Sequence, residues 1–337
     1  MPTAIPIEGF LRSELPLIDV RSPSEFAQGH IPRAVNLPLF TDEERSVVGT
    51  LYKQRGRDVA MLEGLRIAGP KLAGLVESAR LIAPDGNVGV HCWRGGERSA
   101  TVGWLLEKTA SMKVLTLQKG YKAFRKLVLD SFGRNWNLRI LGGYTGSGKT
   151  ELLQKLRGLG EQTLDLEGLA NHKGSAYGGI GAGMQPSTEQ FENLIWDSLR
   201  RFDPRRPIWV EDESRLVGFV KIPDLLYAQM RANTVEFVNM PVEQRTARLV
   251  EEYGALPKEE LAAATTRIQK RLGPQHAQEA LAALAADDLH RVAMITLTYY
   301  DKTYARGLGE RDPASIHMLD VNDMSIDDLA RKLAERK

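Results

Sequence analysis

The chain has 337 residues, 42% of them hydrophobic and 26% charged, with a formal net charge of +2; this predicts two globular domains and by itself gives no sign of nucleic-acid binding. No apolar run approaches the roughly 20 residues needed to span a membrane, and residues 1–6 do not resemble a secretory signal. The single cysteine excludes an internal disulfide and a dithiol redox centre, so we expect a protein of the reducing cytoplasm without membrane partners.

The first half of the chain alternates short apolar strands with helices. A buried strand is predicted over residues 17–20, and Ser22 and Pro23 are typical of the cap and first turn of a helix that ends near Gly29. Further strands are expected over residues 34–38, 87–90 and 113–117, and helices over 66–83, 99–106 and 121–129. This alternation predicts an α/β fold, with a parallel sheet and helices on its faces.

A polar segment over residues 131–135 separates the two halves, so the predicted domains are residues 1–132 and 133–337. The second half alternates again, with strands expected over 138–141, 208–210 and 234–238. Long charged helices are expected over 242–285, which predicts a second α/β domain with added helices.

The only cysteine lies between a predicted strand and a predicted helix, in the segment His91-Cys92-Trp93-Arg94-Gly95-Gly96-Glu97-Arg98-Ser99. Backbone N–H groups and the helix dipole favour an anion at such a turn, and Arg94 and Arg98 add positive charge. These effects favour a thiolate, which makes Cys92 a candidate nucleophile. The alternative is a small buried hydrophobic residue, the usual state of a free cysteine, but two glycines and two arginines do not describe an apolar core.

The first half resembles the rhodanese family over most of residues 5–130. The resemblance rests on residues 17–21, 25–26 and 29–38, on the cysteine loop and on residues 119–124, where Lys119 stands in place of a glycine that the family often has. It implies a rhodanese-like parallel sheet whose loop cysteine carries sulfur or selenium as a persulfide-type adduct. Asp19 and His30 then belong to the surroundings of the site, although Asp19 could simply pair with Arg21 to pin the loop.

The spacing within the cysteine loop also fits cysteine-dependent phosphatases. Cys92 is followed by five residues and then by Arg98 and Ser99. In that family the loop amides and the arginine hold a phosphate while the thiolate attacks phosphorus. A loop that admits phosphate also admits selenophosphate, so the spacing leaves both chemistries open. Trp93, Gly95, Gly96 and Ser99 belong to the loop in either case.

A second motif, G-x-x-x-x-G-K-T over residues 143–150, follows a predicted strand and precedes a predicted helix, the context of a phosphate-binding P-loop. Its glycines let backbone amides face phosphates, the lysine adds a charge and the threonine hydroxyl can bind Mg²⁺. The predicted phosphate-binding residues are Gly143, Gly146, Ser147, Gly148, Lys149 and Thr150.

A later strand ends in carboxylates, as the Walker B strand of a P-loop protein does. Glu211 and Asp212 follow the apolar run 208–210, and either could order the shell of a Mg²⁺ ion that arrives with substrate, without a permanently bound metal. A solvated acidic strand end is the alternative.

The fusion of these two halves resembles the tRNA 2-selenouridine synthase family over nearly the whole chain. The supporting segments are residues 48–53, 56–57, 91–99, 143–150, 172–179 and 211–215. The resemblance implies a selenotransferase that replaces sulfur by selenium at C2 of wobble 2-thiouridine in the anticodon loop of tRNA. It implies selenophosphate as the selenium source, Cys92 as the selenium carrier and geranyl diphosphate as the source of an S-geranylated intermediate. An enzyme that supplies selenophosphate is an expected partner.

Several assignments stay open at this point. The P-loop holds either geranyl diphosphate with Mg²⁺ or a nucleotide such as ATP. The glycine-rich segment 174–181 either closes over substrate or is an ordinary surface loop, and Trp93 either stacks on the wobble base or packs the loop. Candidates for contacts with the tRNA backbone, each of which could instead lie on a solvated helix face, are Arg245, Arg248, Arg267, Lys270 and Arg271.

Two competing functions also remain. One is a cysteine phosphatase with a nucleotide-binding regulatory half. The other is a P-loop kinase or NTPase whose rhodanese half is only a binding module.

Overall fold

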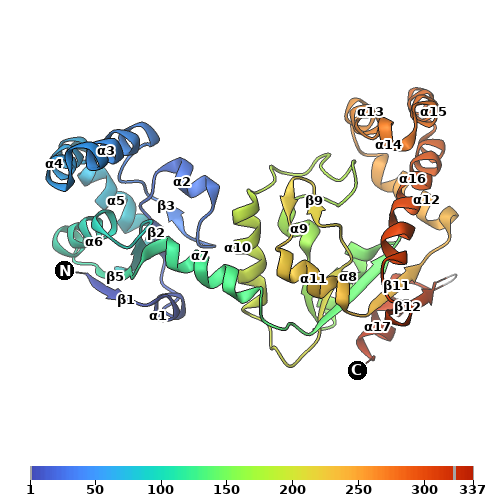
Figure 1. The fold of residues 1–337 in the computed structure, drawn as a ribbon, viewed down its shortest axis with the longest axis horizontal. Coiled ribbons are helices and arrows are strands. Elements are labelled where there is room, and N and C mark those ends of the chain that lie inside the picture. Colours follow the sequence, from blue (N-terminus) through green and yellow to red (C-terminus); the bar gives the residue numbers. More distant parts are fainter. Residues whose placement is uncertain (1, 322–323, 337) are drawn as a thin grey trace. The chain divides into compact units, whose positions relative to one another are not determined.

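The computed structural model describes residues 2–321 and 324–336. The chain divides into two compact units, Met1–Ser131 and Phe132–Lys337, coloured blue to green and green to red in Figure 1. Each unit contains one five-stranded sheet in which all neighbouring strands are parallel. The predicted α/β class is therefore confirmed.

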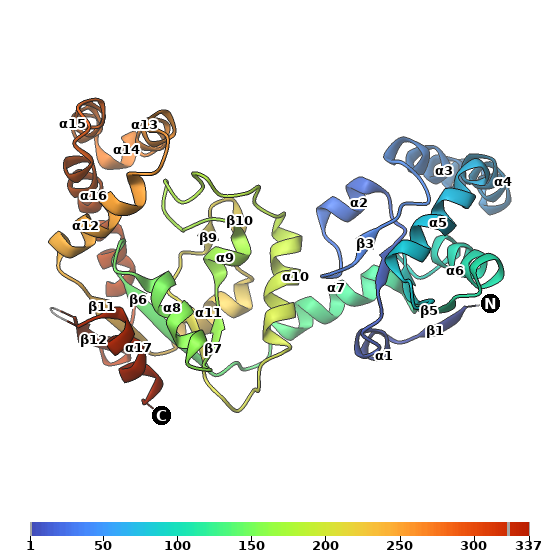
Figure 2. The ribbon, with the colours of Figure 1, turned by 180° about the vertical axis from the view of Figure 1, so that it is seen from behind.

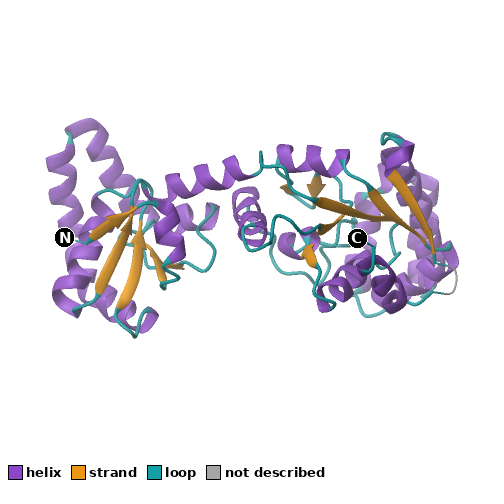
Figure 3. Cartoon of the chain, turned by 90° about the horizontal axis from the view of Figure 1, so that it is seen from below, coloured by secondary structure: helices purple, strands orange, loops and turns teal. Residues whose placement is uncertain are grey.

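The sheet of the first unit has the order β1-β5-β4-β2-β3. Its strands are β1 (Thr3–Ile5), β2 (Leu17–Asp19), β3 (Val35–Asn36), β4 (Asn87–His91) and β5 (Lys113–Leu117). Its helices are α1 (Ile7–Arg12), α2 (Pro23–Gln28), α3 (Asp42–Arg55), α4 (Arg57–Ala68), α5 (Leu72–Ile82), α6 (Glu97–Ala110) and α7 (Gly120–Ser131). Because the strands run parallel, the segments that follow β2, β4 and β5 meet at one edge of this sheet, whose strands and flanking helices Figure 3 shows.

Helices α3 and α4 are the main departure from the predicted elements. The helix expected over 66–83 is instead α4, a short 3₁₀ turn (Gly69–Lys71) and α5, because Pro70 lacks an N–H and its ring cannot continue an α-helix. Helix α3 has no buried residue, so no apolar stripe reveals it in the sequence. The usable signal was the capping box formed by Thr41 and Glu44 at its start.

The sheet of the second unit has the order β12-β11-β6-β8-β7. Its strands are β6 (Leu138–Gly143), β7 (Gln162–Leu164), β8 (Ile208–Glu211), β11 (Val235–Asn239) and β12 (Ile316–Asp320). An antiparallel hairpin of β9 (Leu216–Val217) and β10 (Val220–Lys221) stands apart from this sheet. The helices that accompany the sheet are α8 (Lys149–Gly158), α9 (Leu166–Ala170), α10 (Thr188–Leu199), α11 (Asp224–Ala232) and α17 (Ile326–Ala334).

The added helices of the second unit have an apolar core of their own. They are α12 (Val242–Tyr253), α13 (Lys258–Arg267), α14 (Gln269–Leu272), α15 (Pro274–Ala285) and α16 (Leu289–Gly309), and Figure 2 shows them gathered at one side of this unit. The predicted helical stretch is interrupted at Pro257 and at Gly273-Pro274, where proline ends or begins a helix. In the part of the chain that the structure describes, no helix is both long and apolar enough to cross a bilayer.

Candidate functional site

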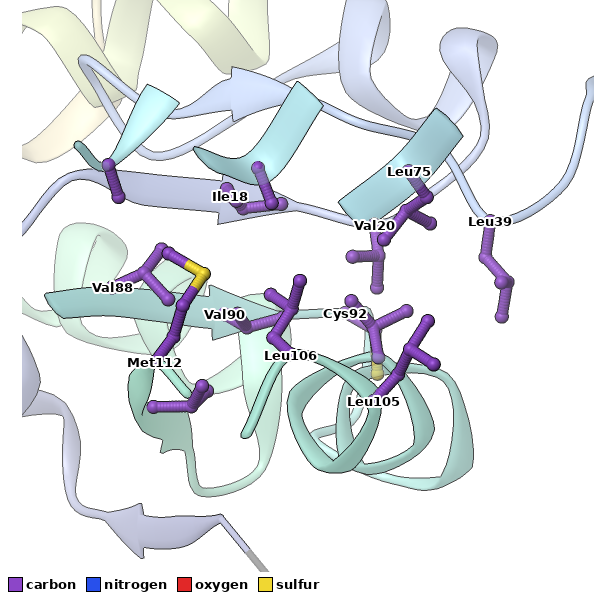
Figure 4. Close-up of a cluster of buried hydrophobic side chains, with 14 of the residues drawn as sticks. Ile18, Val20, Leu39, Leu75, Val88, Val90, Cys92, Leu105, Leu106 and Met112 are labelled. Atoms are coloured by element: carbon purple, nitrogen blue, oxygen red, sulfur yellow. The ribbon is translucent and has the colours of Figure 1, made fainter. Parts of the chain in front are cut away.

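Cys92 lies in an apolar environment at the carboxyl end of a central strand. It directly follows β4, and residues 93–96 connect it to α6. Figure 4 shows its side chain in the same cluster as Val90 and Leu105, and the residue is only 3% exposed. The strand–loop–helix context is the expected one, but the thiol packs as a small hydrophobic residue, so a reagent reaches the sulfur only if the loop above it moves.

Ser99 gives the buried sulfur a polar partner. The Cys92 Sγ atom lies 3.3 Å from the Ser99 Oγ atom, which also donates to the Gly96 carbonyl at 3.2 Å. A thiol can donate to the hydroxyl while the hydroxyl keeps its bond to Gly96. After deprotonation, the hydroxyl can turn its own proton toward the thiolate. Ser99 therefore suits both protonation states of Cys92.

The cysteine loop presents backbone N–H groups that are free to bind an anion. The amides of Trp93, Arg94, Gly95 and Gly96 donate to no oxygen of residues 2–321 and 324–336. The loop is clamped from the other side by Gly120 (φ 57°), since a Cβ atom there would lie 2.8 Å from the Arg94 amide and closer still to the Cys92 carbonyl. A rigidly held turn with free amides is a typical oxyanion cradle.

The two loop arginines differ in the charge they offer. The Arg98 guanidinium donates to the Glu25 carboxylate with an Nη1–Oε2 distance of 2.6 Å. Burial raises the pKa of Glu25, but Arg98 more than offsets this, so the pKa lies below the usual carboxyl value. Arg94 is exposed and has no ion pair within the described residues. The expectation that both arginines add charge beside the thiol is therefore corrected: Arg98 ties the loop to α2, and Arg94 is the cation left for an anion.

Asp19 and Arg21 form a fully buried ion pair below the loop, with an Oδ2–Nη2 distance of 2.6 Å. Arg21 also donates to the Gly29 carbonyl and lies over the Tyr121 ring. Burial raises the pKa of Asp19, but His91 and Arg21 outweigh it and hold that pKa below its usual value. Of the two interpretations of Asp19, the structure favours pairing that pins the loop.

His30 and Trp93 pack against their own neighbours. The His30 ring stacks on Phe26 with 3.9 Å between centroids, and its Nδ1 atom lies 3.1 Å from the Phe26 carbonyl oxygen. The half-buried Trp93 ring contacts Tyr121 at 5.7 Å between centroids. This contact favours loop packing by Trp93 over base stacking.

In the second unit the P-loop follows β6 and leads into α8. Gly146 (φ 82°) and Gly148 (φ 79°) adopt left-handed conformations that suit glycine. The Lys149 Nζ atom donates to the Gly143 carbonyl at 2.9 Å, and the Thr150 hydroxyl donates to Glu167 at 2.8 Å. The Ser147 hydroxyl is buried and lacks a partner within the described residues. The loop thus places its lysine and hydroxyl groups together, as phosphate binding requires.

Three carboxylates crowd the same edge of this sheet. Glu211 is 2% exposed; its Oε1 atom accepts the Glu167 N–H at 2.8 Å, whereas Oε2 has no partner within the described residues. Burial, together with the charges of Asp165 and Glu167, raises the pKa of Glu211 to about 8. Burial and mutual repulsion also raise the pKa values of Glu167 and Glu213. A cation at this edge would relieve that repulsion.

These groups fit a Mg²⁺ ion that arrives with a diphosphate better than a resident metal. Within the described residues, no group of three or more His, Cys, Asp and Glu side chains is arranged to hold a metal ion. Mg²⁺ usually takes one or two carboxylates and completes its shell with water and substrate phosphates. Thr150 and the orphaned oxygen of Glu211 are the residues that fit such an ion.

Asp212 does not join this cluster. Its carboxylate binds the buried Arg311 guanidinium at 2.6 Å, with Arg231 at 3.8 Å. Asp212 therefore belongs to a structural ion pair, which corrects its assignment as a Mg²⁺ candidate. Glu167 was missed, because only the placement of β7 beside β8 brings it to the P-loop.

The basic residues proposed for tRNA contacts divide into two groups. Arg245 is 3% exposed, binds Asp301 with two hydrogen bonds of 2.9 and 2.8 Å, and donates to the Thr145 carbonyl of the P-loop. It cannot reach a nucleic-acid backbone, so that expectation is corrected. Arg248 pairs with Glu151, and Arg267 donates to the Ala176 carbonyl. Lys270 and Arg271 are exposed and remain candidates.

The glycine-rich segment 174–181 is tied to the added helices. Tyr177 is buried and its hydroxyl lies 2.9 Å from the Thr265 hydroxyl, while the Ala176 N–H donates to the Tyr300 hydroxyl. At the other end of the segment, a Cβ atom on Gly174 would lie 2.7 Å from the Glu167 carboxylate. The segment thus connects the helical cluster to the carboxylates beside the P-loop, which favours a role at the site over an ordinary surface loop.

Comparisons with known proteins agree with both halves of this description. Residues 8–127 match the rhodanese-like domain, and residues 136–332 match the tRNA 2-selenouridine synthase AAA domain. A tRNA 2-selenouridine synthase of Hydrogenovibrio crunogenus is 34% identical, with 90% of this chain and 92% of the relative covered. Those of Shewanella loihica (89% of each chain) and Pseudomonas syringae pv. syringae (87% and 88%) are both 36% identical.

Replacing Asp19 should destabilise the first unit. Asp19→Ala leaves the buried Arg21 guanidinium without its counter-ion, so we expect the free energy of unfolding in urea to fall by about 3–5 kcal/mol. The lowered pKa also means that the contribution of Asp19 is present above the ordinary carboxyl pKa and lost as pH falls through its value in the folded state. Asp58→Ala is the control, because this carboxylate is 98% exposed and 3.7 Å from Arg57, and should change stability by less than about 0.5 kcal/mol. Equal urea midpoints for the two variants would contradict the argument.

Replacing Glu211 should change how stability depends on pH. Because the pKa of Glu211 is raised from 4.5 to about 8, the chain loses stability as pH rises through this window. Glu211→Gln removes the titration, so we expect it to be more stable than the parent chain by a few kcal/mol at pH 8 and similar near pH 4.5. Urea unfolding at both pH values measures this, with the exposed Glu259→Gln as control. A Glu211→Gln variant with the pH slope of the parent chain would show that this carboxyl does not titrate there.

Proposed function

The chain belongs to the tRNA 2-selenouridine synthase family, and we propose that it replaces the sulfur of wobble 2-thiouridine in tRNA by selenium. The observation that carries the proposal is the presence, on one chain, of a cysteine with four free loop amides and a P-loop with buried carboxylates beside it. The two loops suit two different phosphorus-containing substrates.

We assign the P-loop to geranyl diphosphate. Sulfur at C2 leaves poorly as bare sulfide, and S-alkylation converts it into a thiolate leaving group. In this step the bond from C1 of the geranyl group to oxygen breaks, its electron pair stays on diphosphate, and a C1–S bond forms. The loop amides and Lys149 bind the developing diphosphate charge, while Thr150 and Glu211 would hold Mg²⁺, which supplies further charge stabilisation.

We assign the cysteine loop to selenophosphate, with the amides of residues 93–96 and Arg94 holding its oxyanion. A selenosulfide on Cys92 would require the removal of two electrons, because selenium in selenophosphate is already at the selenide level and these substrates supply no oxidant. The balanced step is attack of the Cys92 thiolate on phosphorus. The S–P bond forms, the P–Se bond breaks, and selenide leaves with the electron pair.

The remaining steps also balance. Selenide adds at C2 and expels the geranyl thiolate, and water hydrolyses the S–P bond to release phosphate. Cys92 then acts as the nucleophile that liberates selenium rather than as its covalent carrier. Because Cys92 is only 3% exposed, residues 93–96 must shift when selenophosphate binds.

The product is the first test. We expect tRNA containing 2-thiouridine to gain selenium in place of sulfur when incubated with the protein, Mg²⁺, geranyl diphosphate and selenophosphate. Mass spectrometry of the wobble nucleosides measures the exchange, and Cys92→Ala should abolish it. An unchanged nucleoside would favour the other functions: a phosphatase if aryl phosphates are hydrolysed without tRNA, or an NTPase if ATP turnover is insensitive to Cys92→Ala.

The two loops should be separable by mutation. Cys92→Ser should keep geranyl transfer and lose selenium incorporation, whereas Lys149→Ala should slow geranyl transfer by about 10²- to 10³-fold, because it removes a charge from the leaving diphosphate. Supplying tRNA that is already S-geranylated should restore selenium incorporation in Lys149→Ala. The control is Lys155→Ala on the same helix, whose lysine pairs with Asp327 at 2.8 Å. Equal loss of both steps in either variant would contradict this division.

A further inference from the structure

The turn between α3 and α4 is an exposed basic segment. All residues from 52 to 59 are exposed, and Gly56 (φ 88°) makes the turn. Lys53, Arg55 and Arg57 lie within six residues that contain no acidic side chain. Since α3 has no buried residue, the segment is not explained by packing.

This turn lies beside the cysteine loop. The Arg57 guanidinium donates to the Glu97 carboxylate from Nε at 3.1 Å and from Nη2 at 2.6 Å, and Glu97 is the first residue of α6, directly after the loop. At the other end of α3, the Asp42 carboxylate accepts a 2.6 Å hydrogen bond from Ser24 of α2. The hairpin of α3 and α4 is thus fastened to the same elements that hold Cys92.

Cations without partners gather around the loop. Lys53 and Arg55 make no ion pair within the described residues, nor do Arg94, Lys119 and Lys122. Lys119 and Lys122 flank Gly120, and the Lys122 N–H donates to the Trp93 carbonyl at 3.0 Å. Cations elsewhere in this unit are paired with carboxylates, among them Arg21, Arg45, Arg66, Lys71, Arg98 and Lys126.

We propose that these five residues, the basic rim (Lys53, Arg55, Arg94, Lys119 and Lys122), bind backbone phosphates of the tRNA next to the base that enters the cysteine loop. The inference rests on the proposed function, since it takes tRNA as the partner. Phosphate contacts from Lys and Arg supply most of the non-specific affinity for nucleic acids and set the register of the bound chain. An unpaired cation can make such a contact without breaking an existing ion pair.

The test is the salt dependence of tRNA binding. The double variant Lys53→Ala/Arg55→Ala removes two charges without breaking any contact of the folded chain. We expect its Kd for 2-thiouridine tRNA, measured by fluorescence anisotropy, to rise roughly tenfold, and the slope of log Kd against log salt to fall by about 1–2. KM for tRNA should rise while kcat at saturating tRNA stays unchanged. Lys119→Ala/Lys122→Ala should act in the same direction.

The matched control is Lys108→Ala/Lys113→Ala. Both lysines are exposed and without ion pairs in the described residues, but lie at the end of α6 and the start of β5, at the opposite edge of the sheet. Its Kd should stay within about twofold of the parent chain, as expected for charges that touch no phosphate. An unchanged Kd and slope in both rim variants, or equal losses in rim and control variants, would overturn the proposal. Failure of the parent chain to bind tRNA and to form selenouridine would instead reject the proposed function.

Discussion

Parallel strand pairing is the constraint on which the chemistry of both units depends. In the first unit, Asp19 ends β2 and Cys92 follows β4, and these strands are neighbours. In the second unit, the P-loop follows β6, Glu211 ends β8 and Glu167 follows β7, again on adjacent strands. Since neighbouring strands lie only about 4.8 Å apart, groups distant in sequence meet at the carboxyl edge of each sheet. Any change in strand order would disperse both sites.

Polar groups at these edges fall into two classes. Buried pairs such as Asp19–Arg21, Asp212–Arg311 and Arg245–Asp301 satisfy one another and hold the loops in place. Other groups have no protein partner among the residues described: the amides of residues 93–96, the Ser147 hydroxyl and one oxygen of Glu211. Because buried polar groups are normally hydrogen-bonded, those without partners mark where a ligand would bind. The first class explains stability, and the second supports the proposed chemistry.

The sequence predicted the fold class and both loops, because each depends on local features: apolar strands, glycines at turns, and helix starts. It did not predict contacts set by tertiary structure. Arg98 is neutralised by Glu25, which lies 73 residues earlier, and Arg245 is buried against Asp301 although its helix is charged. Glu167 reaches Thr150 only through the strand order. Helix α3 escaped prediction because it buries none of its residues.

The two loops solve related problems with different leaving groups. Under the proposed function, the P-loop binds the diphosphate that leaves carbon, and the cysteine loop binds the phosphoryl group from which selenide leaves. Both use backbone amides at the start of a helix and a nearby cation, Lys149 in one unit and Arg94 in the other. Only the cysteine loop adds a nucleophile, and its Ser99 hydroxyl can stabilise the thiolate within an apolar cluster. The electron count then decides the role of that thiol: without an oxidant, it can release selenium but cannot store it as a selenosulfide.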